Sequence, residues 1–301
     1  MVMKKLKSTL FLVITAVIWG SAFVAQRVGA NYLRPFTFNG IRFAMGALSL
    51  IPVILIFERG KSDRAQLKNT VLYGLLAGVI LSAASNLQQF GIEITGSAGK
   101  SAFLTGVYTV LVPLIYFMFG RRTGKFVWMG AVVTVIGLYL LCGVQGEASF
   151  GIGDVVLLIG AVLWAFHIIV LDRFGNEVRP LRFSAVQFTV CVVVSGAIAL
   201  FCERDSFSFE YVRAAIIPLL YGGVGSVGIA YTCQLLGQKD ADPTFAAIIL
   251  STESVFSAVG AAIILKEYMT VTGYIGCALM FCGIVLSQIP EKQSPAKQSE
   301  N

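Results

Sequence analysis

A carboxyl group in the middle of a long apolar segment is the group best placed to do chemistry. Glu253 lies in Leu250-Ser251-Thr252-Glu253-Ser254, about ten residues from either end of the apolar segment 244–265. Ionisable groups inside a bilayer are costly, and they are functional candidates by default. Because burial disfavours the charged carboxylate, Glu253 is a candidate to bind a substrate amine or to carry a coupling proton. The structural alternative is a helix-packing carboxyl bonded to neighbouring hydroxyls.

Two further polar residues are expected at a comparable depth. Tyr108 holds the position in the apolar segment 98–119 that Glu253 holds in its own segment, so both side chains are expected to face one cavity. Arg42 lies about seven residues into the segment 36–57. Its guanidinium could bind a substrate carboxylate or an acidic side chain, or its long stem could carry the charge to the outer surface. Both residues are candidate substrate-binding residues.

Aromatic and amide side chains form a second group of candidate substrate-binding residues. Trp19 and Trp164 lie in mid-segment, not at the membrane interfaces where Trp usually anchors a helix. Flat aromatic walls suit a cavity for organic substrates or cations, and tight packing beside small residues is the alternative. Gln88 and Gln234 occupy matching positions on opposite sides of the membrane, with Tyr231 near the second of them. We expect this group to line the cavity and its two approaches.

Few residues are available for metal or cofactor chemistry. His167 is the only histidine, which excludes a multi-histidine metal site. It lies near the cytoplasmic end of its segment and is a second proton-coupling candidate, with a packed histidine as the alternative. The six cysteines show no CxxC spacing and are expected to be reduced. The nucleotide-binding pattern G-x-x-x-x-G-K-[ST] is missing, so neither a metal nor another cofactor is expected.

Long apolar segments must position these residues. Of the 301 residues, 56% are hydrophobic and 13% are charged, whereas a soluble protein has about 25% charged residues. The apolar runs reach the roughly 20 residues of a membrane-spanning helix and lack the alternation of strands. We therefore predict an all-α integral membrane protein with ten transmembrane helices. The predicted helices lie near 6–26, 36–57, 68–90, 98–119, 126–143, 154–171, 183–202, 212–236, 244–265 and 271–289.

The sequence repeats itself after 145 residues. Ala16-Val17-Ile18-Trp19 returns as Ala161-Val162-Leu163-Trp164, and further along the chain the offset becomes 146 residues. We predict a first repeat at 1–145 and a second at 146–289, each with five transmembrane helices, followed by a disordered cytoplasmic tail at 290–301. Because five is an odd number, the two repeats are inverted in the membrane, as in alternating-access transporters.

Lysine and arginine in the loops indicate the orientation. With a cytoplasmic N-terminus, sixteen of these residues fall on the inside and six on the outside, which favours cytoplasmic positions for both termini. The net charge of +7 lies in short loops, so contact with anionic lipid headgroups is expected and nucleic-acid binding is not. The first segment is longer than a signal-peptide core and is interpreted as a retained helix.

Three local features carry further expectations. Asp154 is expected to cap the sixth helix. Lys100 is expected to be solvated at the outer face. The glycine-rich run at 222–228 favours close approach of the eighth helix to a neighbour, with a hinge or an unwound stretch as the alternative.

Several short motifs occur in a fixed order along the chain. They are Trp19-Gly20-Ser21-Ala22-Phe23, Arg42-Phe43-Ala44, Gly153-Asp154-Val155-Val156-Leu157, Ala161-Val162-Leu163-Trp164-Ala165 and Leu265-Lys266-Glu267. In these motifs, the ten segments and the duplication, the chain resembles the ten-helix EamA-type branch of the drug/metabolite transporter superfamily over about residues 8–288. One departure is Gly120-Arg121-Arg122, because the fourth helix of the family usually ends in Gly-Glu.

The resemblance implies export or exchange of small metabolites, often amino acids or related compounds, through a central cavity. We expect a secondary transporter of the cell (inner) membrane that works by alternating access, surrounded by lipid, as a monomer or a weak homodimer. A channel or a non-transporting scaffold is the first alternative. An integral-membrane enzyme is the second, although the chain lacks a reactive cluster for one. The candidate residues fit a zwitterion, and equally a neutral or cationic compound held by aromatic rings.

Overall fold

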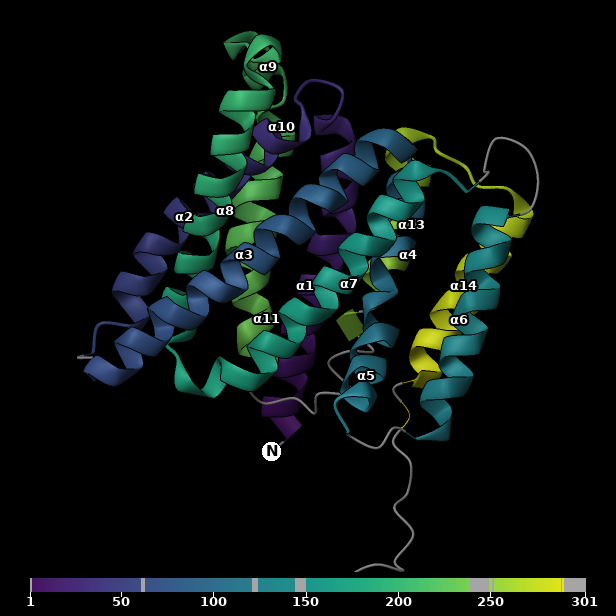
Figure 1. The fold of residues 1–301 in the computed structure, drawn as a ribbon, viewed down its shortest axis with the longest axis horizontal. Helices are drawn as coiled ribbons and strands as arrows, with labels where there is room; N and C mark the ends of the chain where they lie inside the picture. The colour runs from purple at the N-terminus through teal and green to yellow at the C-terminus, as the bar shows by residue number, and fades with distance from the viewer. Residues whose placement is uncertain are drawn as a thin grey trace, which may run out of the picture.

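The computed structural model describes residues 2–60, 63–120, 124–143, 150–238, 249–250, 252–287 and 289, which fold into a bundle of helices with no strand among them (Figure 1). Three features of the sequence lie outside the described residues: Arg121-Arg122, most of the stretch 244–251, and the tail from Pro290. The predictions made for them are therefore not addressed by the structure.

The helices follow the predicted apolar segments in order. They are α1 (Val2–Gly29), α2 (Pro35–Phe57), α3 (Arg64–Thr95), α4 (Ala98–Gly106), α5 (Tyr108–Met118), α6 (Lys125–Gly143), α7 (Ile152–Phe174), α8 (Pro180–Cys202), α9 (Phe209–Ala214), α10 (Ile216–Leu220), a π-helical stretch (Tyr221–Ala230), α11 (Tyr231–Gln238), α13 (Glu253–Gly260), a second π-helical stretch (Ala261–Leu265) and α14 (Val271–Ser287). Single 3₁₀ turns lie at Gly175–Glu177 and Arg204–Ser206.

Seven helical stretches among the described residues have the length and apolar composition of a membrane span. They are Leu6–Gly29, Pro35–Phe57, Arg64–Thr95, Ala98–Met118, Ile152–Phe174, Pro180–Cys202 and Ile216–Gln234. The fifth, ninth and tenth predicted segments hold shorter apolar helices at Lys125–Leu141, Glu253–Leu265 and Val271–Ser287. The protein is thus all-helical with seven candidate spans, and ten crossings stay a prediction.

Helices that occupy the same place in the two repeats pack against each other as antiparallel pairs. The fourth and ninth predicted segments are counterparts and meet through α4 and α13: Ser257 donates a hydrogen bond to the Ala98 carbonyl and Ser254 donates to the Ala102 carbonyl. In the pair α6 and α14, which stands at one edge of the bundle, Gly137 lies directly against the backbone of α14 (Figure 1). Antiparallel packing of counterpart helices is what inverted repeats produce.

In the pair α2 and α8, a glutamate at the end of each helix caps the start of the other helix. Glu58, at the end of α2, accepts hydrogen bonds from the backbone of Leu181 (2.9 Å) and Arg182 (3.3 Å) at the start of α8. Glu203, at the end of α8, accepts hydrogen bonds from the backbone of Phe36 (3.1 Å) and Thr37 (2.7 Å) at the start of α2. Each glutamate satisfies the unpaired N–H groups at the N-terminus of the other helix.

The remaining central helices cross between the repeats in two equivalent contacts. A Cβ atom added to Gly91 of α3 would lie 2.5 Å from the Cγ of Leu157 in α7. Its counterpart Gly237 of α11 would meet the Cγ of Leu12 in α1 at 2.8 Å. The two contacts join residues at matching places in the two repeats, so the same close crossing occurs twice.

The eighth segment combines close packing with an irregular backbone. It consists of α10, the π-helical stretch Tyr221–Ala230 and α11. A Cβ atom on Gly228 would lie 2.2 Å from the Ser49 hydroxyl oxygen of α2, and one on Gly223 would lie 2.8 Å from the Arg42 carbonyl oxygen. Close helix approach is therefore confirmed. The backbone at the same place is π-helical, with more residues in each turn than an α-helix has.

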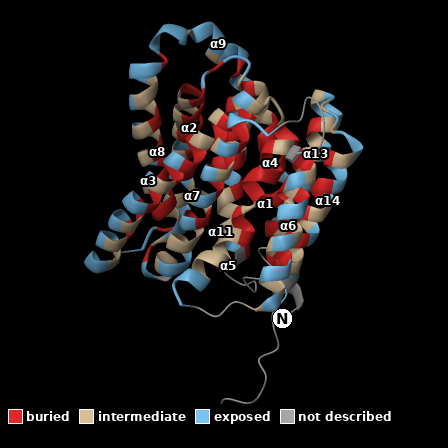
Figure 2. Ribbon diagram, turned by 45° about the vertical axis from the view of Figure 1, so that its right-hand side comes forward, coloured by how far each residue is buried: buried red, intermediate tan, exposed pale blue. Residues whose placement is uncertain are grey.

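Apolar side chains cover the outside of the bundle and polar side chains lie within it. Phe201 is 89% exposed and Met118 is 82% exposed, whereas the buried set includes many Ser, Thr, Asn and Gln residues. Figure 2 shows buried residues on the inward faces of the helices and exposed residues on the outward faces and at the ends. Lipid can solvate an apolar exterior of this kind, and a polar interior is where a transporter binds its cargo.

Candidate functional site

Tyr108 and Glu253 meet inside the bundle. The Tyr108 hydroxyl donates a hydrogen bond of 3.0 Å to Oε1 of Glu253, and the carboxyl-bearing residue is 5% exposed. Each residue is the first of its helix: Tyr108 follows Val107 at the start of α5, and Glu253 follows Thr252 at the start of α13. The sequence placed these two residues at equivalent positions, and the structure brings the two positions into contact.

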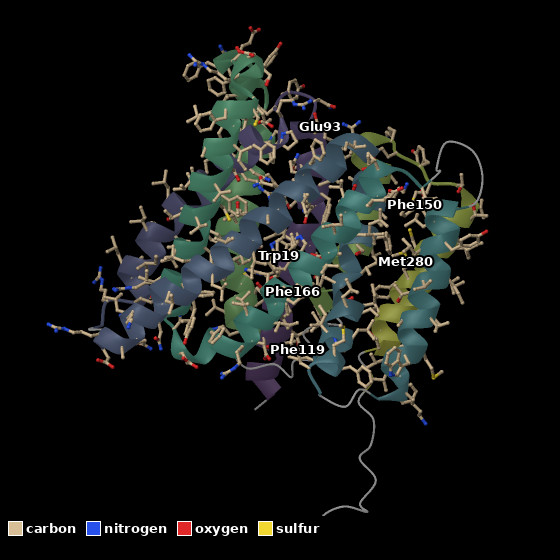
Figure 3. All side chains as sticks on the ribbon, viewed as in Figure 1. Trp19, Glu93, Phe119, Phe150, Phe166 and Met280 are labelled. Atoms are coloured by element: carbon tan, nitrogen blue, oxygen red, sulfur yellow. The ribbon has the colours of Figure 1, made fainter. Side chains whose placement is uncertain are left out.

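Trp19 and Tyr231 form an aromatic wall beside this pair. Trp19, labelled near the middle of the bundle in Figure 3, donates from its indole Nε1 to the Ser226 carbonyl at 3.2 Å. Its ring meets the edge of the Tyr231 ring at a centroid distance of 5.0 Å, and Tyr231 meets Phe188 at 5.2 Å. A Cβ atom on Gly20, the residue after Trp19, would lie 2.5 Å from the Glu253 carbonyl oxygen, so the wall stands close to the carboxyl-bearing residue.

Arg42 lies in the interior and does not reach the outer surface. It is 4% exposed, and its guanidinium lies over the rings of Phe43 (5.0 Å) and Phe38 (5.9 Å). Its Nε has no hydrogen-bond partner, and no ion pair involving Arg42 occurs among the described residues. The snorkelling alternative is therefore wrong, because the first turns of α2 are covered by the eighth segment at Gly222.

Trp164 belongs to a chain of side-chain hydrogen bonds. Its indole Nε1 donates to Oε1 of Gln88 at 2.9 Å, and Nε2 of Gln88 donates to Oε1 of Gln26 at 3.2 Å. Gln89 adds a bond of 3.1 Å to the Gln26 carbonyl. Gln88 is therefore a buried linker between α1, α3 and α7. Gln234 is half-buried and makes no hydrogen bond to a described residue, so these two counterparts have different surroundings.

His167 is a buried histidine with an amide partner. Its Nε2 lies 2.6 Å from Oε1 of Gln187, and its ring meets Trp164 edge-on at 5.8 Å. Gln187 is the counterpart of Arg42 in the repeat. As a packed histidine, His167 has Gln187 as its hydrogen-bond partner. Among the described residues, no hydrogen bond joins His167 to Tyr108 or Glu253.

A buried amide network was not expected from the sequence. Asn39 donates to Oδ1 of Asn86 at 2.8 Å, and Nδ2 of Asn86 donates to the Ser195 hydroxyl at 3.0 Å. The network joins α2, α3 and α8, with Asn39 0% exposed. Its signal in the sequence is a polar residue in each of three apolar segments, but that pattern does not show which of the residues face one another.

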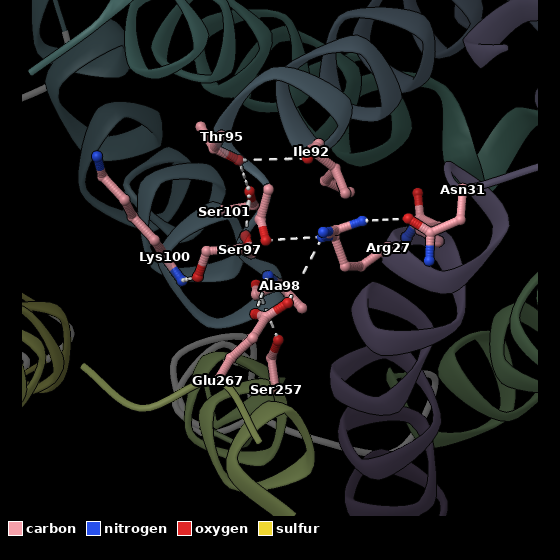
Figure 4. Close-up of polar contacts among 12 residues, drawn as sticks. Arg27, Asn31, Ile92, Thr95, Ser97, Ala98, Lys100, Ser101, Ser257 and Glu267 are labelled. Carbon is pink, nitrogen blue, oxygen red and sulfur yellow. Dashed lines mark hydrogen bonds and ion pairs between the residues drawn. The ribbon is translucent and has the colours of Figure 1, made fainter. Parts of the chain in front are cut away.

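A cluster of ion pairs joins the two repeats at one end of the bundle. Arg27 lies 3.5 Å from Glu267, and Glu267 accepts a hydrogen bond of 3.0 Å from the Ala98 backbone at the start of α4 (Figure 4). Nearby, Lys100 pairs with Asp154 at 2.9 Å. The prediction that Lys100 is solvated is wrong, because its ammonium group forms an ion pair with the almost fully buried carboxylate of Asp154.

Asp154 also confirms its predicted capping role. Its Oδ2 accepts a hydrogen bond of 2.9 Å from the Gly151 backbone at the start of α7. One carboxylate therefore caps a helix of the second repeat and pairs with Lys100 of the first.

The interior offers polar binding groups and no metal cluster. No group of three or more His, Cys, Asp or Glu side chains that could hold a metal lies among the described residues. The described interior holds a carboxyl group with a phenol donor, the aromatic side chains of Trp19, Tyr231 and Trp164, and a buried guanidinium. Such groups can orient an organic molecule.

Comparison with known proteins shows the family to which this chain is related. The model of the EamA-like transporter family matches twice, at residues 6–143 and 151–288. An uncharacterized transporter of Archaeoglobus fulgidus is 26% identical over 94% of this chain and 86% of its own length. The uncharacterized transporter YoaV of Bacillus subtilis is 23% identical over 93% and 96%.

Two further matches extend the comparison. YedA of Escherichia coli, named an uncharacterized inner membrane transporter, is 24% identical over 59% of this chain and 57% of its own length. A solved crystal structure has the same fold, with a TM-score of 0.67 and 19% identity over 93% of this chain and 95% of the other. With the family model matching both halves, this multi-pass membrane protein belongs to the EamA-like transporter family, within the drug/metabolite transporter superfamily.

Proposed function

We propose that the protein is a secondary transporter that moves small metabolites, such as amino acids or related compounds, by alternating access across the cell (inner) membrane. In this proposal ten helices form two inverted halves, 1–145 and 146–289, with both termini in the cytoplasm. The protein acts as an exporter or exchanger, as a monomer or a weak homodimer. Related chains carry transporter names, which supports the class and leaves the substrate to be identified.

The Tyr108–Glu253 contact carries this proposal. The two residues are counterparts in the repeats, each is the first residue of its helix, and they meet at 3.0 Å inside the bundle. Transporters built from inverted repeats bind their cargo near the membrane midplane, at the repeat interface, beside interrupted helices. The contact joins counterpart residues of the two repeats inside the bundle, so the substrate site is proposed to lie there and to include Glu253 and Tyr108.

The surrounding residues suggest how a substrate is held. Glu253 is proposed to bind a substrate amine or a coupling proton, because it is buried and no described cation pairs with it. Trp19, Trp164 and Tyr231 would supply aromatic walls for the body of the substrate. Gln88 and Gln234 would contact it on entry or exit. His167 is the weaker proton-coupling candidate because Gln187 already holds its ring.

A counterflow experiment tests the proposed class. Purified protein in liposomes loaded with unlabelled compound would be offered labelled amino acids, amines and nucleosides. A carrier gives saturable, transient accumulation of one class, because each turnover exchanges one molecule for another. A channel gives flux without counterflow, a scaffold gives none, and an enzyme converts the compound. Any of the last three results from folded protein would overturn the proposal.

A further inference from the structure

Arg42 is a buried cation without a counter-ion among the described residues. It is 4% exposed, its Nε has no partner, and it lies over the rings of Phe38 and Phe43 and close to Gly222. Aromatic rings offset part of the cost of a buried guanidinium. They do not replace an anion, because a buried charge is stabilised chiefly by an opposite charge with hydrogen bonds.

In the second repeat, the side chain at the position equivalent to Arg42 has a hydrogen-bond partner. The counterpart of Arg42 is Gln187, and its amide oxygen is bound by His167 at 2.6 Å. The counterpart of His167 in the first repeat is Ala22, which is 2% exposed and has no polar side chain. The first repeat therefore carries a charge at this position and lacks the side chain that satisfies its counterpart.

The Tyr231 hydroxyl is a second hydrogen-bond donor near Arg42, and it also lacks a described partner. The Tyr231 ring packs against Phe188 at 5.2 Å, and Phe188 packs against Phe43, the ring that lies under the Arg42 guanidinium. The Tyr231 hydroxyl makes no hydrogen bond to a described residue. On its other side the Tyr231 ring touches Trp19, and the next residue, Gly20, lies against the backbone of Glu253. A guanidinium and a phenol are together the donors that a carboxylate accepts from.

We propose that Arg42 and Tyr231 form an anion subsite that receives a carboxylate of the transported molecule, at the end of the site opposite Glu253. This inference rests on the proposed carrier function and narrows the substrate to compounds with one carboxylate, which stays near the Tyr231 ring while the rest of the molecule extends toward Trp19 and Glu253. A single guanidinium and a single phenol suit one carboxylate better than a multiply charged phosphate, which needs a cluster of basic groups.

The first test measures thermal stability without any ligand. Arg42→Met keeps an apolar stem and removes the unpaired charge, so the variant is expected to have a melting temperature equal to or above that of the wild type in detergent. Arg213→Met, at an exposed arginine, is the matched control and is expected to change nothing. A clear fall in the melting temperature of Arg42→Met alone would show that the guanidinium supports the fold, and would overturn the proposal.

The second test measures ligand-induced stabilisation with three matched sets of probes: amino acids, their carboxamides, and the corresponding acids without the amine. Compounds with a carboxylate are expected to raise the melting temperature of the wild type and of Arg213→Met, and to have no effect on Arg42→Met. Tyr231→Phe is expected to weaken the response about tenfold in concentration, as the loss of one hydrogen bond to a charged group would. Stabilisation by carboxamides as strong as by carboxylates, or a full response of Arg42→Met, would contradict the subsite.

The two proposals fail separately. Saturable counterflow of neutral or cationic compounds only, with no effect of carboxylates on stability, would leave the carrier function intact and overturn the anion subsite. Stabilisation by carboxylates that depends on Arg42, without counterflow of any compound, would support the subsite and overturn the carrier function.

Discussion

Tyr108 and Glu253 lie 145 residues apart, occupy the same place in the two repeats, and share a hydrogen bond of 3.0 Å. Side chains at equivalent positions can touch only close to the axis that relates the two halves. The contact therefore lies close to this axis, inside the bundle, and it includes a carboxyl group. Its importance can be tested at several levels.

Removing the phenol donor should weaken transport without unfolding the protein. Tyr108→Phe leaves Oε1 of Glu253 without its hydrogen bond, which costs about 1–3 kcal/mol for a buried group. We expect counterflow to fall at least several-fold, with a loss of only a few degrees in melting temperature. Tyr211→Phe, at an exposed tyrosine, is the control. If Tyr108→Phe exchanges substrate at the wild-type rate, the hydrogen bond between Tyr108 and Glu253 has no role in substrate binding.

Proton coupling through Glu253 predicts a change in pH dependence. If Glu253 carries the proton, Glu253→Gln is expected to abolish transport driven by a pH gradient, because glutamine neither binds nor releases a proton in this range. His167→Gln tests the second candidate and should retain the response. Initial rates measured with and without an imposed gradient decide between them. A Glu253→Gln variant that transports normally with an unchanged pH dependence rules out the coupling role.

The reciprocal glutamates should stabilise the pair α2 and α8. Glu58→Ala and Glu203→Ala each leave two backbone N–H groups without an acceptor, so each should lower stability by about 1–3 kcal/mol. The effects should be close to additive, because the two carboxylates contact different residues. Melting temperatures of the single and double variants test this, with the exposed Glu210→Ala as control. A melting temperature unchanged in both single variants would contradict the capping role.

The ion pair between Lys100 and Asp154 should behave as a coupled unit. Lys100→Met leaves the carboxylate of Asp154 buried and unpaired, which costs about 3–5 kcal/mol when a buried pair loses one partner. In the double variant Lys100→Met with Asp154→Asn both charges are absent, and stability should partly return. A double-mutant cycle in detergent measures this coupling. Strictly additive losses would show that the pair contributes no specific interaction.

Packing of α6 on α14 should depend on Gly137. A Cβ atom there would lie 2.6 Å from the Gly276 carbonyl oxygen and 2.7 Å from the Met280 backbone nitrogen, so Gly137→Ala must push the helices apart. We expect a loss of about 1–3 kcal/mol, the range for overpacked sites. Gly196→Ala is the control, because a Cβ atom at Gly196 would have no neighbour within 4 Å. Equal melting temperatures of the two variants would contradict the close crossing.

The sequence predicted the parts of the fold that depend on local composition and on the duplication. Long apolar runs determine where helices form, and the offset of 145 residues made Tyr108 and Glu253 equivalent before any contact was known. Asp154 was recognisable as a cap because capping is local. In each case the evidence lies within one segment or in the repeat itself.

Contacts that depend on which helix faces which were beyond the sequence. Glu58 and Glu203 lie at segment ends, where hydropathy treats charge as a loop signal, and the N-termini that they cap are far along the chain. Lys100 was expected in solvent because the approach of α7 was unknown. Arg42 has a stem long enough to reach the surface, and only the packing of the eighth segment at Gly222 shows that it stays buried.

The most direct test of the account is counterflow by the wild type and Glu253→Gln side by side, in liposomes loaded with the same panel of compounds. The account predicts saturable exchange of one class by the wild type and at least a tenfold loss in a Glu253→Gln variant that melts within a few degrees of it, with Glu210→Gln unchanged. Wild-type rates of exchange in Glu253→Gln would contradict the placement of the substrate at the Tyr108–Glu253 contact.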